Sequence, residues 1–288
     1  MNNDNGAVSP KQTDSGVVTP LETRAEMLRL SARGYTQLRH VLVQLPDEKG
    51  PRASTLARVV SQRKHRALVL YMLLLACWPW LAERREPVQG DVWIRALTTD
   101  KGLTWTGSTL SRAWADLETL GLVERKREER LLRVVPRRED GADSYDPPRG
   151  RTDRWNAYFI LPDSFWMDEL FATLSLPALA MLLVVAKETN AKSEVWLTYE
   201  HCEEWYGIKP QSVQKGLKEL DAARLLHRRT EKIKAPLSPT GWSVHMWYSL
   251  TGEFGYEARK KLRKRAANER QSRLAKTNPK NTPKEASA

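Results

Sequence analysis

Amide and ammonium side chains recur at helical spacing in one segment of the second half of the chain. Its positions i, i+3, i+4 and i+7 are occupied by Gln211, Gln214, Lys215 and Lys218. On a helix these positions share one face. Glutamine can form two hydrogen bonds with adenine, and lysine can reach the acceptor atoms of guanine. The spacing therefore predicts a helix face that can contact base edges in DNA.

A shorter polar face recurs in the first half of the chain. Ser108, Ser111 and Arg112 follow the same helical spacing, and Ala115 completes the face. Arginine can also reach guanine, but the remaining side chains are short. The later segment is therefore the stronger candidate for base recognition.

Small polar residues lie where each of these helices would begin. These residues are Ser108 and Thr109 in the first segment and Gln211 and Ser212 in the second. Hydroxyl, amide and backbone donors at a helix N-terminus can hold a phosphate group. We expect these positions to contact the DNA backbone.

The two segments belong to an internal repeat, because residues 106–126 superpose without a gap on residues 209–229. Each copy has one apolar stripe at helical spacing, which turns its polar positions outward. The stripes consist of Leu110, Ala113, Trp114, Leu117 and Leu120 in the first copy and of Val213, Gly216, Leu217 and Leu220 in the second. The repeat predicts two helices of equivalent role.

Capping residues mark where these helices start and stop. Thr106 is a suitable N-cap, Pro210 suits a first helical position, and Gly121 follows the first helix as a C-cap. Arg224 stands where the second copy would have the glycine. That difference weakens the cap but leaves the periodicity intact.

A β-hairpin is expected directly after each helix. Residues 122–126 can pair with 131–135, and residues 225–230 can pair with 242–250 across a loop at 231–241 that contains proline and glycine. Both hairpins are basic. Their candidate DNA contacts are Arg125, Lys126, Arg127 and Arg130 in the first and Arg228, Arg229, Lys232 and Lys234 in the second.

Apolar helices are expected upstream of both copies, at residues 67–82 and 176–188. Shorter helical segments follow at 92–97 and 199–207, the latter with a possible N-cap at Thr198. Each half thus has the order helix, short helix, turn, recognition helix and hairpin.

In this order, and in the L-x-x-L-G-L-V pattern that ends residues 109–123, the chain resembles the winged helix-turn-helix superfamily. The resemblance covers about 65–140 and 155–255. It implies a mainly α fold with small β-hairpins (α+β), built from two tandem winged-helix domains joined by a short linker. With two such domains in tandem, the chain resembles bacterial regulators and plasmid or phage replication initiators.

The rest of the chain is divided by composition. The expected organisation is a disordered N-terminal segment (1–20), an accessory helical arm (21–64), a first winged-helix domain (65–138), a linker (139–154), a second winged-helix domain (155–255) and a basic C-terminal tail (256–288).

The net charge of +12 favours a polyanionic partner, either nucleic acid or an anionic membrane surface. Residues 256–288 hold eleven Lys and Arg against three Glu and so supply most of this excess. Their expected contribution is salt-sensitive attraction that does not depend on base sequence. The residues assigned to that contact include Arg259, Lys260, Lys261, Arg263, Lys264 and Arg265.

Several function classes are disfavoured. Cys77 and Cys202 lie far apart, so we expect no disulfide framework, structural zinc or other cofactor. No Gly-Lys pair occurs, which disfavours a P-loop, and the histidines lack the spacing of an H-E-x-x-H site. The polar residues around His201 show no fixed ligand spacing. The chain is therefore expected not to be an enzyme.

The longest apolar run, residues 68–81, is too short to span a bilayer, and residues 1–16 show no signal pattern. We expect a cytoplasmic, nucleoid-associated protein with no membrane partner. The leading hypothesis is a sequence-specific transcriptional regulator that binds double-stranded DNA as a homodimer on a partly palindromic operator. The alternatives are a plasmid or phage replication initiator at origin repeats, in contact with the replication machinery, and a module that binds protein.

Overall fold

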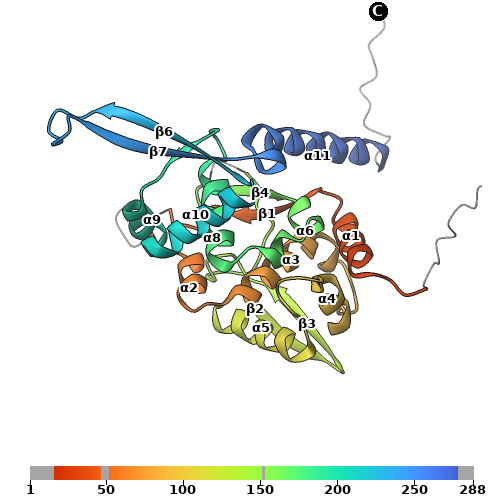
Figure 1. The fold of residues 1–288 in the computed structure, drawn as a ribbon. Helices are drawn as coiled ribbons and strands as arrows, with labels where there is room; N and C mark the ends of the chain where they lie inside the picture. Colours follow the sequence, from red (N-terminus) through yellow and green to blue (C-terminus); the bar gives the residue numbers. More distant parts are fainter. Residues whose placement is uncertain (1–15, 47–51, 151–152, 278–288) are drawn as a thin grey trace, which may run out of the picture.

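The computed structural model describes residues 16–46, 52–150 and 153–277 and shows a mixed α+β fold with small antiparallel sheets (Figure 1). The helices are α1 (Pro20–Ser31), α2 (Thr55–Ser61), α3 (His65–Leu81), α4 (Gly90–Leu97), α5 (Gly107–Thr119), α6 (Ser164–Met167), α7 (Leu170–Thr173), α8 (Leu176–Glu188), α9 (Tyr199–Tyr206), α10 (Pro210–Ala222) and α11 (Tyr256–Thr277), with 3-10 turns η1 (His40–Leu42) and η2 (Gly252–Phe254). The strands are β1 (Tyr35–Arg39), β2 (Val123–Glu128), β3 (Leu131–Pro136), β4 (Tyr158–Pro162), β5 (Val195–Trp196), β6 (Leu226–Lys234) and β7 (Trp242–Leu250).

The repeated order of elements is present in both halves. The first half runs α3, α4, α5 and the β2–β3 hairpin, and the second runs α8, α9, α10 and the β6–β7 hairpin. The expected N-cap of α9 at Thr198 is confirmed, since its side chain accepts a hydrogen bond from the His201 amide at 3.1 Å. A third strand, β5, adds to β7 in the second half alone among the described residues.

The loop of the second hairpin is shorter than expected. Residues 231–234, assigned to the loop, continue β6, and Lys234 pairs with Trp242. Glu231 and Ile233 turn to one face while Lys232 and Lys234 turn to the other, as in any strand. Hydrogen bonding across the hairpin thus outweighs the polar composition that favoured a loop, and the hairpin is a longer arm than the sequence indicated.

The two equivalent helices end in the same backbone conformation. After α5, Gly121 has φ +75° and the Leu122 amide donates to the Leu117 carbonyl at 2.9 Å. After α10, Arg224 has φ +57°, and the Leu225 amide donates to the Leu220 carbonyl at 2.9 Å. The repeat therefore extends to a left-handed C-terminal turn, which Arg224 adopts although it carries a Cβ atom.

Replacing Arg224 with glycine should raise the free energy of unfolding by roughly 0.5–1 kcal/mol, because glycine tolerates the left-handed conformation without the Cβ clash. Urea denaturation of wild type and Arg224→Gly measures this gain. Gly121→Ala, which places a Cβ in the equivalent turn, should shift the midpoint in the opposite direction. Equal midpoints for wild type and Arg224→Gly would contradict the account of this turn.

The core is built on the two apolar helices α3 and α8. Residues 67–77 of α3 and 178–186 of α8 are buried throughout, and the buried apolar side chains of both halves form one contiguous cluster in the described part of the chain. No helix within 16–46, 52–150 or 153–277 is both long and apolar enough to cross a membrane.

A strand replaces part of the expected helical arm. Residues 21–64 were expected to form a helical arm with an interruption at Gly34, and α1 indeed ends before it, at Ser31, while Gly34 has φ +77°. The following β1 pairs antiparallel with β4 of the second half, and its Leu38 is fully buried in the core that both halves share. Burial alternates along most of β1, as expected of a strand and not of a helix. The arm therefore joins the two halves.

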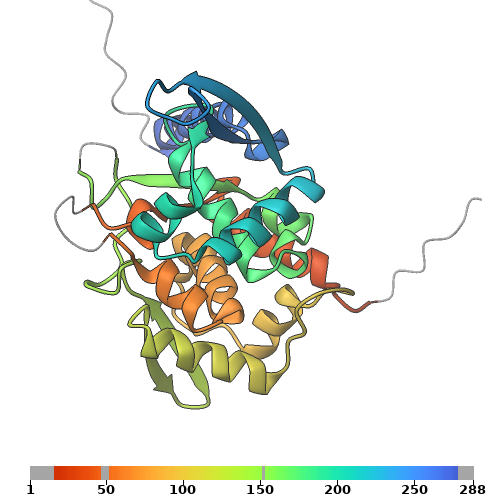
Figure 2. The same ribbon diagram turned by 60° about the vertical axis from the view of Figure 1, so that its left-hand side comes forward.

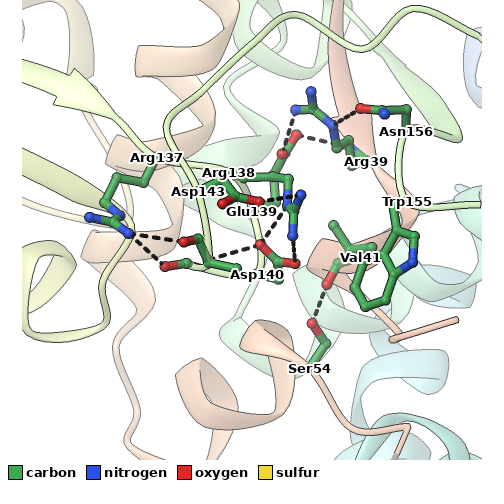
Figure 3. A network of polar contacts seen from close by, with 12 residues as sticks. Arg39, Val41, Ser54, Arg137, Arg138, Glu139, Asp140, Asp143, Trp155 and Asn156 are labelled. Carbon is green, nitrogen blue, oxygen red and sulfur yellow. Dashed lines mark hydrogen bonds and ion pairs between the residues drawn. The ribbon is translucent and has the colours of Figure 1, made fainter. Parts of the chain in front are cut away.

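The segment expected to be a linker is anchored to this same strand (Figure 3). Glu139 is fully buried, and its carboxylate accepts from Arg39 Nη1 at 2.8 Å and from the Arg39 amide at 3.0 Å. Arg39 Nε donates to Asn156 Oδ1 at 3.2 Å. The start of this segment is therefore a buried part of the fold, held to β1 by an ion pair between two buried side chains.

Buried arginines also attach the two ends of the described chain to the body. Arg24 of α1 donates to the carbonyls of Ala96 and Thr98, at 3.1 and 3.0 Å, where α4 ends. Arg259 of α11 donates to the Ala186 and Thr189 carbonyls at 2.8 and 2.9 Å, where α8 ends. Positive side chains suit helix C-termini, whose last carbonyls lack partners within the helix. Part of the basic composition therefore supports the fold. Residues 1–15 and 278–288 of the two expected terminal segments lie outside the described residues.

Candidate nucleic-acid interface

Helix α10 presents its polar face to solvent and its apolar face to the core. Gln211, Gln214, Lys215 and Lys218 are exposed, whereas Val213, Gly216, Leu217 and Leu220 are buried. The burial pattern predicted from the sequence is confirmed. Ser212 at the helix start is half-buried.

Close packing against α8, beside which α10 lies in both views (Figure 1 and Figure 2), sets the position of α10. A Cβ atom on Gly216 would lie 2.3 Å from the Pro177 carbonyl oxygen and 2.8 Å from Met181 Cγ. One turn further on, the Glu219 carboxylate accepts from the Ser175 amide at 2.7 Å, which ties α10 to the N-terminus of α8. The outer face of α10 is thereby held on a rigid element.

The β6–β7 hairpin has two faces of different character. Because side chains alternate along a strand, Arg228, Thr230, Lys232 and Lys234 share one face, which we call the inner face. At the base of the arm this face includes the buried residues Leu226 and Tyr248. Lys232, Lys234 and Arg228 are exposed and carry no carboxylate partner among the ion pairs of the described residues.

A cleft of about 340 Å³ joins α10 to the inner face of the arm. It is lined by Tyr199, Gln214, Leu217, Lys218, Asp221, Leu226, Arg228 and Tyr248. Two of the predicted contacts on α10, Gln214 and Lys218, therefore share one concave surface with Arg228 of the arm. Asp221 is the single acidic side chain in this lining.

The structure adds residues to this surface that the sequence reasoning missed. Tyr199 and Tyr248 line the cleft, and Lys209 lies exposed directly before α10. The alternation of β7 could have placed Tyr248 on the inner face, since it pairs with Arg228. The position of Tyr199 depends on how α9 packs, for which the sequence carries no local signal.

Arg229 lies on the opposite face of the arm from its neighbours in the predicted set. Its guanidinium is bonded to Glu194 at 2.9 Å and to Glu231 at 3.4 Å, and it stacks over Trp247 at 5.4 Å. Arg228 and Arg229, both predicted as DNA contacts, therefore lie on opposite faces of the arm, because adjacent residues of a strand point in opposite directions.

The polar face of α5 is also exposed, at Ser108, Ser111 and Arg112. The N-cap at Thr106 is confirmed as a reciprocal cap: its hydroxyl accepts from the Thr109 amide at 3.3 Å, and the Thr109 hydroxyl accepts from the Thr106 amide at 2.7 Å. The hydroxyl of Thr109 therefore satisfies the helix end, which reduces its capacity to bind phosphate.

Acidic neighbours neutralise much of the first hairpin. Arg125 Nε donates to Glu118 at 2.9 Å, and this hydrogen bond holds the pKa of the Glu118 carboxyl below its usual value. Two further ion pairs link the strands of the hairpin. Arg133 of β3 pairs with Glu128 at 2.6 Å, and Arg137, directly after β3, pairs with Glu124 at 2.9 Å. The remaining predicted contacts of this hairpin, which are exposed, are Lys126, Arg127 and Arg130.

The helix α11 separates its basic residues into two groups. Lys260, Lys261 and Lys264 are exposed. Arg263, in contrast, donates to the Asn190 side chain at 2.7 Å and so helps Arg259 attach the helix to the end of α8. Arg263, predicted as a phosphate contact, is therefore half-buried and takes part in packing α11 against the body.

The His201 segment is an aromatic packing site. The His201 ring stacks on Trp205 with ring centres 4.6 Å apart, and Trp196 stacks on His245 at 4.4 Å. Within the residues that the structure describes, no group of three or more His, Cys, Asp or Glu is placed to hold a metal ion.

Comparison of the chain with protein-family models, with curated proteins and with solved structures finds no match.

Proposed function

We propose that the chain is a non-enzymatic protein that binds double-stranded DNA in a sequence-specific manner, with α10 in the major groove and the β6–β7 arm against the adjacent backbone. The observation that carries the proposal is the shared surface of α10 and the arm. Gln214 and Lys218 of α10 line one cleft with Arg228, and Lys232 and Lys234 continue the inner face along the arm beyond that cleft. Such side chains are suited to base edges and to phosphates, respectively.

The order of elements supports a winged-helix arrangement in the second half. There α8, β5, α9, α10 and the β6–β7 hairpin follow one another, and the sheet order is β5-β7-β6. In such an arrangement the third helix enters the major groove and the hairpin flanks it. The first half repeats the order but offers fewer long polar side chains, so we assign base recognition to α10 and a supporting contact to α5.

We favour a transcriptional regulator, and one observation keeps a replication initiator as the second candidate. Both α5 and α10 belong to one contiguous core, so a single chain holds them in a fixed relation. A chain that holds both helices in this way can bind one repeated DNA site without a second copy of the protein. Binding to direct repeats at an origin requires this. A regulator would bind as a homodimer to a palindrome instead.

Selection of duplexes from a random-sequence library, followed by footprinting, tests both points. An enriched sequence motif supports specific DNA binding, and failure to retain any duplex at low salt overturns it. A palindromic footprint supports the regulator, whereas an asymmetric site that one chain fills supports the initiator. Binding of protein without salt-dependent DNA affinity would instead support an interaction module.

Replacing Lys260, Lys261 and Lys264 together with alanine should weaken binding to all duplexes alike. Each phosphate contact contributes about 0.9 to the slope of log affinity against log salt concentration, so the slope should flatten by up to about 3. Titrations at several salt concentrations measure it, with a random duplex as control. A loss confined to the selected duplex would contradict a backbone role for α11.

A further inference from the structure

The tip of the β6–β7 arm carries a fully exposed leucine. Leu237 lies in the loop of residues 235–241, between Pro236 and Pro239, and makes no contact that shields it from water. Figure 1 shows that the arm projects away from the helices, so its tip lies at an extremity of the molecule. Exposure of a leucine side chain to water is unfavourable in free energy, and a partner that buries this side chain would gain that free energy on binding.

Hydrogen bonds hold the loop in one shape. The Ala235 amide donates to the Gly241 carbonyl at 2.9 Å, and the Ser238 amide donates to the Ala235 carbonyl at the same distance. The hydroxyls of Ser238 and Thr240 both donate to the Trp242 carbonyl, at 3.1 and 2.9 Å. Because these contacts and the two prolines restrict the backbone, Leu237 is presented on a rigid apex.

The arm behind the apex combines positive charge with further exposed apolar surface. Lys232 and Lys234 share the inner face with Trp242 and Val244, which are 39% and 45% exposed. The Lys232 ammonium lies over the Trp242 ring at 4.5 Å. The outer five residue pairs of the arm, from Thr230 and Met246 outward, extend roughly 15 Å. The end of the arm is therefore suited to a partner that is both anionic and able to accept an apolar side chain.

The first hairpin lacks these features. Its tip consists of Glu129 and Arg130, both charged and exposed, and the strands behind it carry the ion pairs described above. The exposed leucine is therefore a property of one arm and not of both copies of the repeat.

We infer that the arm inserts Leu237 between two base pairs of the bound duplex from the minor groove and so kinks the DNA. This inference rests on the proposed DNA binding. Stacked bases supply the apolar surface that Leu237 lacks, and the flanking phosphates face Lys232 and Lys234. Apolar wedges of this type unstack a base step, and the bent duplex then contacts more of the protein.

Energy transfer between dyes at the two ends of a selected duplex tests the inference. The wild type should increase the transfer on binding, and Leu237→Ser should lose most of that increase while binding within a few-fold of the wild-type affinity. Leu237→Met keeps an apolar wedge and serves as the matched control, which should bend the duplex as the wild type does. The wild type should also bind a nicked duplex roughly tenfold more tightly, because a nick lowers the cost of bending, and Leu237→Ser should lose this preference.

The outcomes separate this inference from the proposed function. If the wild type binds no duplex, the proposed function fails and the inference fails with it. If the duplex is bound and bent equally by wild type and Leu237→Ser, the wedge is refuted while DNA binding stands. Loss of self-association in Leu237→Ser with an unchanged bend would show that the tip contacts protein, which also overturns the inference.

Discussion

Replacing Glu139 with alanine should lower the free energy of unfolding by about 3–5 kcal/mol, because it leaves the buried Arg39 guanidinium without its carboxylate. Arg39 is 1% exposed and cannot turn to solvent without breaking the β1–β4 pairing. Its remaining partners, Asn156 Oδ1 at 3.2 Å and the Asp146 backbone carbonyl, are both neutral. Urea denaturation followed by circular dichroism measures the loss, and Glu139→Gln gives a milder variant if the alanine protein does not fold.

Two control variants test whether the loss of stability in Glu139→Ala arises because the ion pair is buried. Arg149→Ala breaks an exposed ion pair with Asp146, 3.1 Å long, in the same segment, and should cost less than about 1 kcal/mol. The double variant Arg39→Met with Glu139→Leu removes both charges and should recover most of the stability. If Glu139→Ala cost no more than Arg149→Ala, the docked position of residues 139–146 would be wrong.

Gly216→Ala should destabilise the protein by about 2–3 kcal/mol, although alanine is normally the better helix former by about 1 kcal/mol. The added methyl group would lie 2.3 Å from the Pro177 carbonyl oxygen, which belongs to the backbone and cannot move aside. The only relief is a shift of α10 away from α8. Thermal unfolding measures the stability, and binding of a selected duplex should weaken in parallel because Gln214 and Lys215 move with the helix.

Gly107→Ala is the matched control for this change. Gly107 begins α5, and a Cβ atom there would meet nothing within 4 Å. The same substitution should leave stability unchanged or slightly higher. A stabilised Gly216→Ala protein with full DNA affinity would contradict the close packing of α10 on α8.

Local features of this fold were accessible to sequence reasoning. The apolar stripe of residues 213–220 correctly predicted which side of α10 is buried, and the caps at Thr106 and Thr198 correctly predicted two helix starts. Both hairpins form in the segments where they were expected, although the second extends into its expected loop. These features depend on neighbours within a few residues, which periodicity and capping describe.

Long-range pairing was not accessible. Nothing near β1 in the sequence indicates that it pairs with β4, and so a strand was expected to be a helix. The net charge overstated the number of basic side chains that are free to meet a partner. A count of basic residues cannot separate the buried arginines Arg24, Arg39 and Arg259 from the exposed lysines. The face occupied by Arg229 likewise depended on the exact register of β6.

Titration of a selected duplex with the double variant Gln214→Ala, Lys215→Ala tests the central proposal most directly. Fluorescence anisotropy should show affinity for the selected duplex reduced roughly tenfold or more, at about 1–3 kcal/mol for each lost base contact, with affinity for random duplex changed far less. Arg229→Ala, on the outward face of the arm, should bind like the wild type. Equal affinity of the double variant and the wild type for the selected duplex would show that α10 does not read DNA.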